Sequence, residues 1–200
     1  MEFYELHPVT PQQRFINKAV EVLKNGGVII YPTDTIYGFG CDIFNKDALQ
    51  RIYDIKNESG EKLFSFMCPD LKDIAQYAKV SDYAYKTMKK LLPGPYTFVL
   101  PAAKEVPKKL WTKRKTVGIR VPNNNVALTL AKELGNPIIS TSVTKRLGGV
   151  YFDPLEIKTA FDSQVDLMLS VGALEGQPSS IIDLSTDEPE ILRVGAGDVS

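Results

Sequence analysis

Histidine and cysteine are scarce in this chain, which has one histidine and two cysteines among 200 residues. Ser-His and Cys-His catalysis would both have to use His7, which lies beside Pro8 near the N-terminus, where a surface role is expected. Cys41 and Cys68 form no Cys-x-x-Cys or Cys/His pattern, so neither a structural disulfide nor a zinc site is expected. The cysteine usage fits a reducing cytoplasm, and no protein-held metal is predicted.

Long apolar runs and nucleotide-binding glycine loops are also missing. No apolar stretch approaches the ~20 residues that a membrane span needs. The N-terminal segment MEFYELHPVT lacks the basic region and apolar core of a signal peptide. Neither G-x-G-x-x-G nor G-x-x-x-x-G-K-[ST] occurs, which argues against a Rossmann or Walker phosphate loop. We expect a cytoplasmic protein without a membrane partner.

Charge is balanced overall but unevenly distributed. The formal net charge is zero, yet residues 86–120 hold ten basic residues and one acidic residue, a balance of +9. Residues 150–200 hold ten acidic and two basic residues, a balance of −8. A positive face on a neutral protein favours a polyanionic partner.

The hydrophobic pattern alternates between strands and helices along the whole chain. Strands are expected at 27–32, 63–69, 96–100, 116–122, 137–142, 165–170, 179–185 and 190–194. Helices are expected after a Thr10 cap, after an Asn45 cap, and at 70–78, 81–92, 125–134 and 153–161. No linker or repeat divides the chain, so the prediction is one α/β domain, residues 1–200, with a twisted mixed sheet and flanking helices.

Polar side chains follow several of the expected strands, where open α/β sheets bind ligands. Hydroxyls come from Thr33, Thr35, Tyr37, Thr141 and Ser142, and cations come from Lys56, Arg120 and Arg193. Singly, each has an ordinary explanation, because Ser and Thr at strand ends make local turns and arginines point to solvent. Together, two arginines among hydroxyl-rich strand exits make an anion pocket an equal alternative.

Six segments resemble, in order, the motifs of the YrdC/YciO-type family, which includes the threonylcarbamoyl-AMP synthases. They are GGVIIYPTDTIYGFGCD, LPGPYTFVL, VGIRVP, PIISTSV, PSSIIDL and ILRVGA, and they cover roughly residues 12 to 198. Six co-ordered motifs are far more specific than one. The pattern is closer to the YciO branch than to the established synthases.

The resemblance implies a twisted α/β domain with a concave basic groove, and a nucleotidyltransferase reaction. In the family, ATP, L-threonine and bicarbonate give threonylcarbamoyl-adenylate for tRNA modification, with Mg²⁺ expected alongside ATP. By motif match, Thr33, Thr35, Tyr37, Arg120 and Ser179 would bind the substrate. The same match implies that Lys56, Ser142 and Arg193 would meet the nucleotide.

Two positions depart from the synthase motifs. The family's Lys-x-Arg reads Lys56-Asn57-Glu58, so a carboxylate stands in place of a phosphate-facing arginine. The family's Ser-x-Asn reads Ser142-Val143-Thr144, which removes an amide. The sequence therefore leaves open whether the protein is an enzyme.

A cluster of basic residues suggests contact with nucleic acid. It comprises Lys86, Lys89, Lys90, Lys108, Lys109, Lys113, Arg114 and Lys115, together with Lys104 and Trp111. A phosphate-tracking groove with a stacking aromatic has this composition, and so does a solvated lysine face beside a core tryptophan. The resemblance favours RNA, either tRNA or double-stranded.

Three hypotheses follow from the sequence. The first is a threonylcarbamoyl-AMP synthase, and the second is a nucleotide- and RNA-binding protein that keeps the groove but has lost or changed the reaction. The third is a small-metabolite module without RNA. Glu58 and Thr144 favour the second over the first, and the basic segment disfavours the third.

Overall fold

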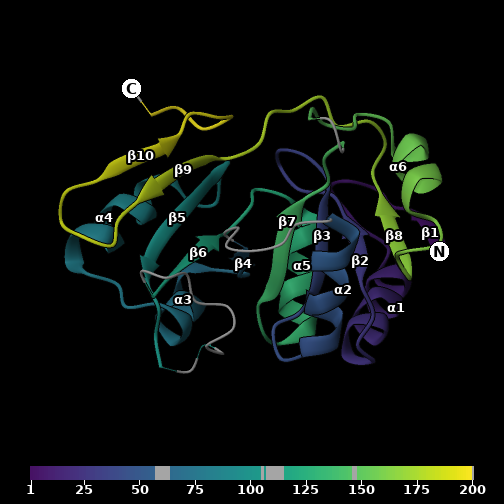
Figure 1. The fold of residues 1–200 in the computed structure, drawn as a ribbon, viewed down its shortest axis with the longest axis horizontal. Helices are drawn as coiled ribbons and strands as arrows, with labels where there is room; N and C mark the ends of the chain where they lie inside the picture. The colour runs from purple at the N-terminus through teal and green to yellow at the C-terminus, as the bar shows by residue number, and fades with distance from the viewer. Residues whose placement is uncertain (57–63, 105, 107–114, 146–147, 200) are drawn as a thin grey trace.

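The computed structural model describes residues 1–56, 64–104, 106, 115–145 and 148–199. They form a mixed sheet in the order β1-β8-β2-β3-β7-β4-β6-β5-β9-β10 (Figure 1). Its strands are β1 (Glu2–Glu5), β2 (Ile29–Tyr31), β3 (Gly38–Asp42), β4 (Ser65–Met67), β5 (Tyr96–Pro101), β6 (Thr116–Arg120), β7 (Ile138–Ser142), β8 (Leu167–Ser170), β9 (Ser180–Asp183) and β10 (Glu190–Arg193). Parallel and antiparallel pairs alternate irregularly, as in β2–β8 and β2–β3. The predicted mixed α/β class is confirmed.

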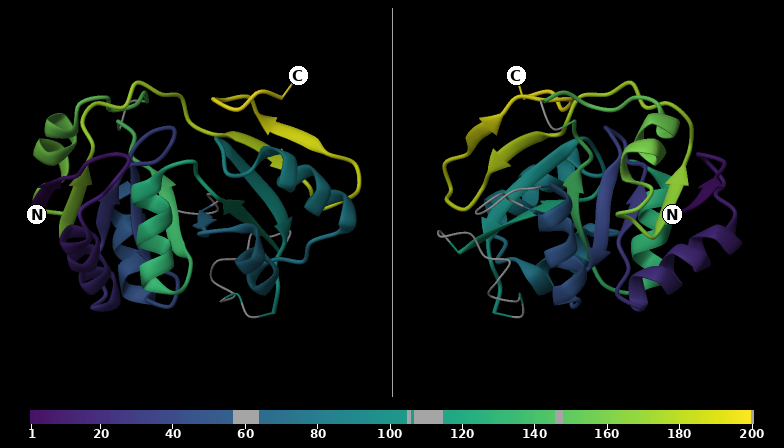
Figure 2. Two further views of the ribbon diagram at one scale, coloured as in Figure 1. Left: turned by 180° about the vertical axis from the view of Figure 1, so that it is seen from behind. Right: turned by 45° about the vertical axis from the view of Figure 1, so that its right-hand side comes forward.

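Helices cover both faces of this sheet. They are α1 (Gln13–Lys24), α2 (Lys46–Lys56), α3 (Leu71–Tyr77), α4 (Asp82–Leu91), α5 (Asn125–Leu134) and α6 (Pro154–Phe161). Seen from behind, α5 lies in front of the sheet, whereas α2 is in front in Figure 1 (Figure 2). The buried residues accordingly divide into two clusters, one with α1 and α5 and a larger one with the other four helices.

Strand β2 and the residue before it show why the sheet is buried on both sides. Val28 and Ile30 pack into the larger cluster, whereas Ile29 and Tyr31 pack into the α1–α5 cluster. Successive side chains of a strand point to opposite faces, so a continuous apolar run serves two helix layers. None of these side chains is exposed to solvent.

Helix boundaries follow local capping chemistry in most places. Asn45 Oδ1 accepts from Ala48 N at 2.9 Å, as the sequence predicts, and Ser81 Oγ accepts from Ala84 N at 3.2 Å. Gly135 ends α5 in the left-handed conformation that glycine tolerates best, with φ of 83°. These contacts fix where α2 and α4 begin and where α5 ends.

The predicted start of the first helix is wrong. Helix α1 begins at Gln13 after Gln12, whose side chain makes no capping bond. Thr10 is instead held by His7, whose Nδ1 lies 3.1 Å from Thr10 N and 3.0 Å from Thr10 Oγ1. The hydrogen bonds to His7 therefore take the place of the predicted Thr10 cap.

Two strands are absent from the prediction. Strand β1 pairs in parallel with β8 at the edge of the sheet, and β3 lies between β2 and β7. Within the described ranges, no helix is long and apolar enough to cross a membrane.

The sheet order places β3, β7, β4 and β6 side by side, and the ends of these strands carry the polar side chains discussed next.

Candidate functional site

A polar pocket of about 340 Å³ is lined by residues in or next to the consecutive strands β3, β7, β4, β6, β5, β9 and β10. Its described lining comprises Ile36, Tyr37, Gly38, Lys56, Ser65, Thr97, Arg120, Ser140, Thr141, Ser142, Thr144, Ser179, Ile181 and Arg193. Three of these residues are cations and seven are serine or threonine, and no Asp or Glu is among them. The volume falls in the range of small-molecule sites, about 300–1,000 Å³. This composition suits an anionic ligand.

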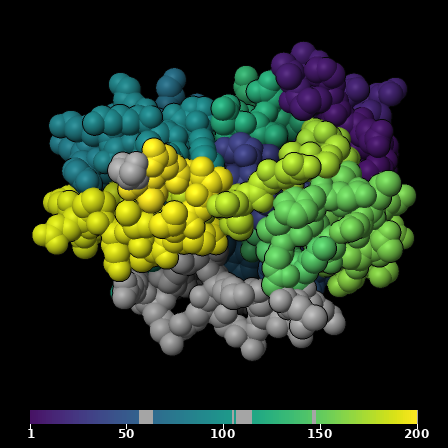
Figure 3. Space-filling model, turned by 90° about the horizontal axis from the view of Figure 1, so that it is seen from above, coloured from purple at the N-terminus to yellow at the C-terminus, as the bar shows by residue number. Residues whose placement is uncertain are grey.

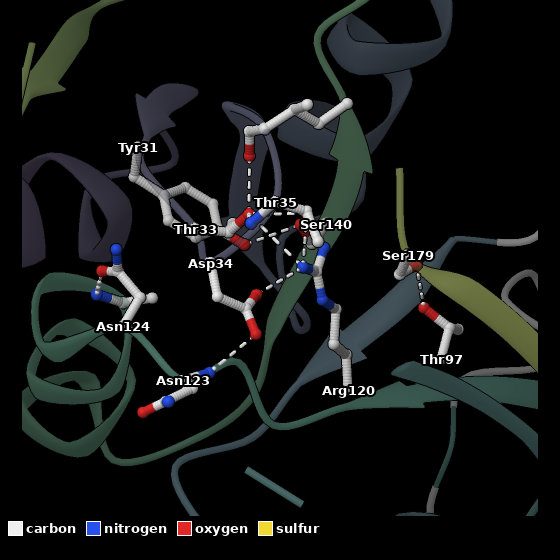
Figure 4. Close-up of polar contacts among 12 residues, drawn as sticks. Tyr31, Thr33, Asp34, Thr35, Thr97, Arg120, Asn123, Asn124, Ser140 and Ser179 are labelled. Carbon is white, nitrogen blue, oxygen red and sulfur yellow. Dashed lines mark hydrogen bonds and ion pairs between the residues drawn. The ribbon is translucent and has the colours of Figure 1, made fainter. Parts of the chain in front are cut away.

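Arg120, at the end of β6, is a largely buried lining residue of this pocket and is held by the loop after β2. Its Nη2 donates to Asp34 Oδ1 at 2.6 Å and to Thr35 Oγ1 at 2.6 Å (Figure 4). Thr33 Oγ1 lies 3.4 Å from the same nitrogen. The Nε atom is buried and has no hydrogen-bond partner in the described part of the chain. An orphaned buried donor of this kind is rare and points to a ligand.

Lys56 reaches the pocket from the last turn of α2. Its Nζ donates to Ser142 O at 3.0 Å and to Thr144 Oγ1 at 2.9 Å. Thr144, the residue that departs from the family's Ser-x-Asn, thus contacts the lysine of Lys-x-Arg. The departure preserves an oxygen acceptor for Lys56 while it removes an amide donor.

Arg193, at the end of β10, forms the opposite wall. Its Nε and Nη2 donate to Ser179 O at 2.9 and 2.7 Å, and Nη2 also reaches Ser179 Oγ at 3.2 Å. Ser179 Oγ is 2.7 Å from Thr97 Oγ1 on β5. Burial lowers the pKa of Arg193, and the positive charge of Arg120 lowers it further. Two like charges facing one pocket are relieved when an anion binds between them.

The structure brings together most of the residues that the sequence singles out for small ligands. Lys56, Tyr37, Arg120, Ser142, Ser179 and Arg193 all line the pocket. Thr33 and Thr35 lie behind it and contact Arg120. The Tyr37 hydroxyl donates to Gly172 O at 2.6 Å, on the segment that follows β8. Their assignment to the substrate stays a prediction.

Those basic residues predicted for nucleic acid that the structure describes lie outside the pocket lining. Lys86, Lys89 and Lys90 are exposed on α4, beside Tyr83 and Tyr85, which are 40% and 47% exposed. Lys115 is also exposed, just before β6. Lys108, Lys109, Lys113 and Arg114 fall outside the described residues, as do Trp111 and Glu58. None of the described basic residues of this group lines the pocket.

Several site residues escaped the sequence reasoning. Asp34 stands between the two predicted threonines, and Thr97 lies in the segment that matches Pro-Gly-Pro-x-Thr, so both had a motif signal. Ser140 faces the pocket and accepts a hydrogen bond from the buried Tyr31 hydroxyl at 2.6 Å. This hydrogen bond joins two residues that are 109 positions apart in the chain, so no local sequence pattern predicts it.

Comparison with known proteins identifies the family of this chain. The family model Sua5_yciO_yrdC, described as "Telomere recombination", matches residues 21–195. The chain belongs to this family. It is similar to YciO of Escherichia coli K12, with 46% identity over 202 residues that cover 99% of this chain and 97% of YciO. The crystal structure of E. coli YciO superposes with a TM-score of 0.95 over 100% of this chain and 98% of YciO.

The family's synthases are more distant relatives. A threonylcarbamoyl-AMP synthase of Coxiella burnetii is 34% identical over 182 residues, covering 90% of this chain and 96% of the synthase. The crystal structure of P. abyssi Sua5 with L-threonine gives a TM-score of 0.91 at 24% identity, over 98% of this chain and 58% of Sua5. The latter likeness concerns the fold. The predicted resemblance, including its YciO branch, is confirmed.

Proposed function

We propose that this protein binds a nucleotide in the pocket and RNA, either tRNA or double-stranded, on its basic surface, in the cytoplasm. The observation that carries the nucleotide part is the pocket itself, with three cations, seven serine or threonine side chains and no carboxylate in its described lining. Arginine and lysine among hydroxyl donors match phosphate oxygens in both charge and hydrogen-bonding capacity. A neutral ligand would leave the buried Arg120 Nε without a strong acceptor.

The residues also suit ATP better than they suit a resident metal. Among the described residues, no group of three His, Cys, Asp or Glu is arranged to hold a metal ion. Mg²⁺, which prefers carboxylate and phosphate oxygens, would therefore be held by the phosphates of ATP. Lys56 and Arg193 would contact those phosphates, and Arg120 would take a carboxylate or phosphate.

Calorimetric titration with ATP tests the nucleotide part. We expect Lys56→Ala, Arg120→Ala and Arg193→Ala each to weaken ATP binding about tenfold or more, because a charged hydrogen bond contributes about 1.5–3 kcal/mol. Lys132→Ala is the matched control, since Lys132 is an exposed lysine on α5 outside the pocket. If all four variants bind ATP with the affinity of the wild type, the nucleotide does not bind in the pocket.

Synthase activity is the second candidate function. The Coxiella burnetii relative at 34% identity favours it, as does the gathering of Lys56, Arg120 and Ser179 in one pocket. In that reaction the site would bring a threonine carbamate in line with the α-phosphate of ATP while cations stabilise the developing charge. No nucleophilic side chain is needed, which fits a chain with one histidine.

A pyrophosphate-release assay separates the two candidates. If the protein is a synthase, it should release pyrophosphate from ATP in the presence of L-threonine and bicarbonate, and Arg120→Ala should abolish this release. Absence of pyrophosphate release by the wild type would rule out synthase activity. The double variant Glu58→Arg with Thr144→Asn restores the synthase motif. Under the binding proposal it should tighten ATP binding, because it replaces a negative charge of this motif with a positive one and the phosphates of ATP are anionic.

A further inference from the structure

The carboxylate of Asp34 lies between two segments that are distant in sequence. Its Oδ1 accepts from Arg120 Nη2 at 2.6 Å, and its Oδ2 accepts from Asn123 N at 2.9 Å (Figure 4). The side chains of Arg120 and Asp34 are only 8% and 9% exposed. Each carboxylate oxygen therefore has one strong donor, and water has little access to either partner.

The second contact of Asp34 makes it a rigid support. Asn123 immediately precedes Asn124, whose Oδ1 caps α5 by accepting from Ala127 N at 3.0 Å. Asp34 is thereby tied to the start of α5, whose apolar face is buried, as well as to its own loop. A side chain held at both oxygens gives Arg120 a fixed point of attachment.

Arg120 is consequently held by one end of its guanidinium. The Nη2 atom has two N–H groups, and Asp34 Oδ1 and Thr35 Oγ1 accept them at 2.6 Å each. The guanidinium is planar, so fixing Nη2 also fixes the directions of Nη1 and Nε. Within the described residues, Nε is buried without a partner, and Arg120 lines the pocket.

We propose that Asp34 is a positioning residue, which holds Arg120 so that Nε and Nη1 are presented to an anionic ligand of the pocket. This inference rests on the proposed anion-binding function of the site. Asp34 does not itself line the pocket. It acts through Arg120 by removing the rotations that would otherwise be lost when the ligand binds.

Electrostatics makes the expected change in ligand affinity on removal of Asp34 distinctive in its direction. A carboxylate near an anion site repels the anion, so removal of its charge should by itself tighten binding. If Asp34 acts mainly by holding Arg120, its removal weakens binding although the pocket becomes more positive. The two effects predict opposite changes in affinity from the same substitution.

Titration calorimetry with ATP and with L-threonine, measured separately, shows whether removal of Asp34 weakens or tightens ligand binding. We expect Asp34→Ala to weaken at least one of the two about tenfold, and Asp34→Asn to weaken it less, because one acceptor oxygen remains. In an Arg120→Ala background, Asp34→Ala should cause no further weakening. Unchanged or tighter binding of both probes by Asp34→Ala and Asp34→Asn would overturn the proposal.

Asp42→Ala is the matched control. Asp42 lies at the other end of β3, where its Oδ1 accepts from Phe44 N at 2.9 Å and Asn136 Nδ2 at 3.0 Å. Its removal breaks side-chain hydrogen bonds without touching Arg120, so we expect unchanged affinity for both probes. A loss equal to that of Asp34→Ala would mean that any lost loop contact disturbs the pocket, which would contradict a specific role for Asp34.

A measurement without ligand separates this inference from the proposed function. The Arg120 Nε–H signal in a ¹⁵N spectrum, assigned by its loss in Arg120→Lys, should be protected from solvent exchange in the wild type and in Asp42→Ala. The Nε–H proton should exchange faster in Asp34→Asn. This variant keeps the shape of the side chain, so it can be measured even if Asp34→Ala does not fold. If wild type binds neither probe, the proposed function fails, and this signal alone decides the inference. An Nε–H signal that Asp34→Asn leaves unchanged would refute it.

Discussion

Tyr31 illustrates at the scale of one residue how the floor of the pocket is built. Its ring is fully buried, and its hydroxyl donates to Ser140 Oγ at 2.6 Å. Gly40 makes room for the ring, because a Cβ at that position would lie 2.9 Å from Tyr31 Cε1. A glycine inside a strand here marks a close approach of an aromatic ring, not a turn.

Burial raises the pKa of Tyr31 to about 12, although its hydrogen bond to Ser140 opposes the shift. A pKa that is higher in the folded state stabilises the fold below the ordinary value near 10, and this stability is lost as pH rises from 10 towards 12. We expect urea unfolding to show a steeper fall in stability between about pH 10 and 12 in wild type than in Tyr31→Phe. Parallel pH profiles would show that Tyr31 ionises freely in the folded state.

At the scale of an element, the segment from Val171 to Ser179 joins the two ends of the sheet. Figure 3 shows it, in lime green, crossing between the yellow C-terminal part and the green part of the molecule. Tyr37 holds its start, since Val171 N donates to the Tyr37 hydroxyl at 3.1 Å and that hydroxyl donates to Gly172 O. Its far end is Ser179, a lining residue of the pocket.

Gly176 is the point where this segment touches the loop that holds Arg120. A Cβ at Gly176 would lie 2.0 Å from the Thr35 carbonyl oxygen, which is backbone and cannot turn aside. We expect Gly176→Ala to lower the free energy of unfolding by about 1–3 kcal/mol and to weaken ATP binding, because the segment must shift. Chemical unfolding and calorimetry measure both effects. Gly172→Ala gives the cost of backbone strain without overpacking, since nothing lies within 4 Å of its Cβ position but its φ of 90° is unfavourable for alanine.

At the scale of the whole molecule, the basic residues of α4 form a surface separate from the pocket. Lys86, Lys89 and Lys90 are exposed together with Tyr83 and Tyr85. Lysines neutralise phosphates and exposed aromatic rings offer stacking surfaces, so this surface supports the RNA part of the proposal. A two-site arrangement would allow nucleotide and RNA to bind at once.

Neutralising α4 tests this arrangement. We expect Lys86→Gln with Lys89→Gln and Lys90→Gln to weaken binding of double-stranded RNA or tRNA. The slope of log affinity against log salt should also become shallower by about 0.7–0.9 for each lost phosphate contact. Fluorescence anisotropy across a salt series measures both, and Lys18→Gln with Lys24→Gln and Lys132→Gln is the control of equal charge. RNA binding that is undetectable, or insensitive to salt, would refute the RNA part.

Several elements could be predicted from sequence because their signals are local. Asn45 and Ser81 cap their helices, and Gly135 ends α5, through contacts within a few residues. Strand β3 could not be predicted in the same way. Gly38 and Gly40 look like turn residues, and only their packing against Ser140 and Tyr31 explains why they lie in a strand.

The candidate site could be predicted in part for the same reason. Motif matches pointed to Lys56, Arg120, Ser179 and Arg193, and the pocket contains all four. Motif matches do not separate residues that line the pocket from residues that support it, so they assign Thr35 and Arg120 the same role although the Thr35 hydroxyl accepts from that arginine. Asp34 was missed because its role depends on two partners 86 and 89 residues away.

The sequence by itself determined the α/β class, the family and the set of chemical groups, since hydrophobic period, capping and motif order are properties of short segments. Only the tertiary structure decided which groups face one another. The sheet order places β6 and β7 on either side of β4 and brings β9 beside β5, so cations from distant segments converge. Hydrogen bonds between these distant segments then fix the direction in which each cationic side chain points. The spacing of residues in the sequence does not predict that direction.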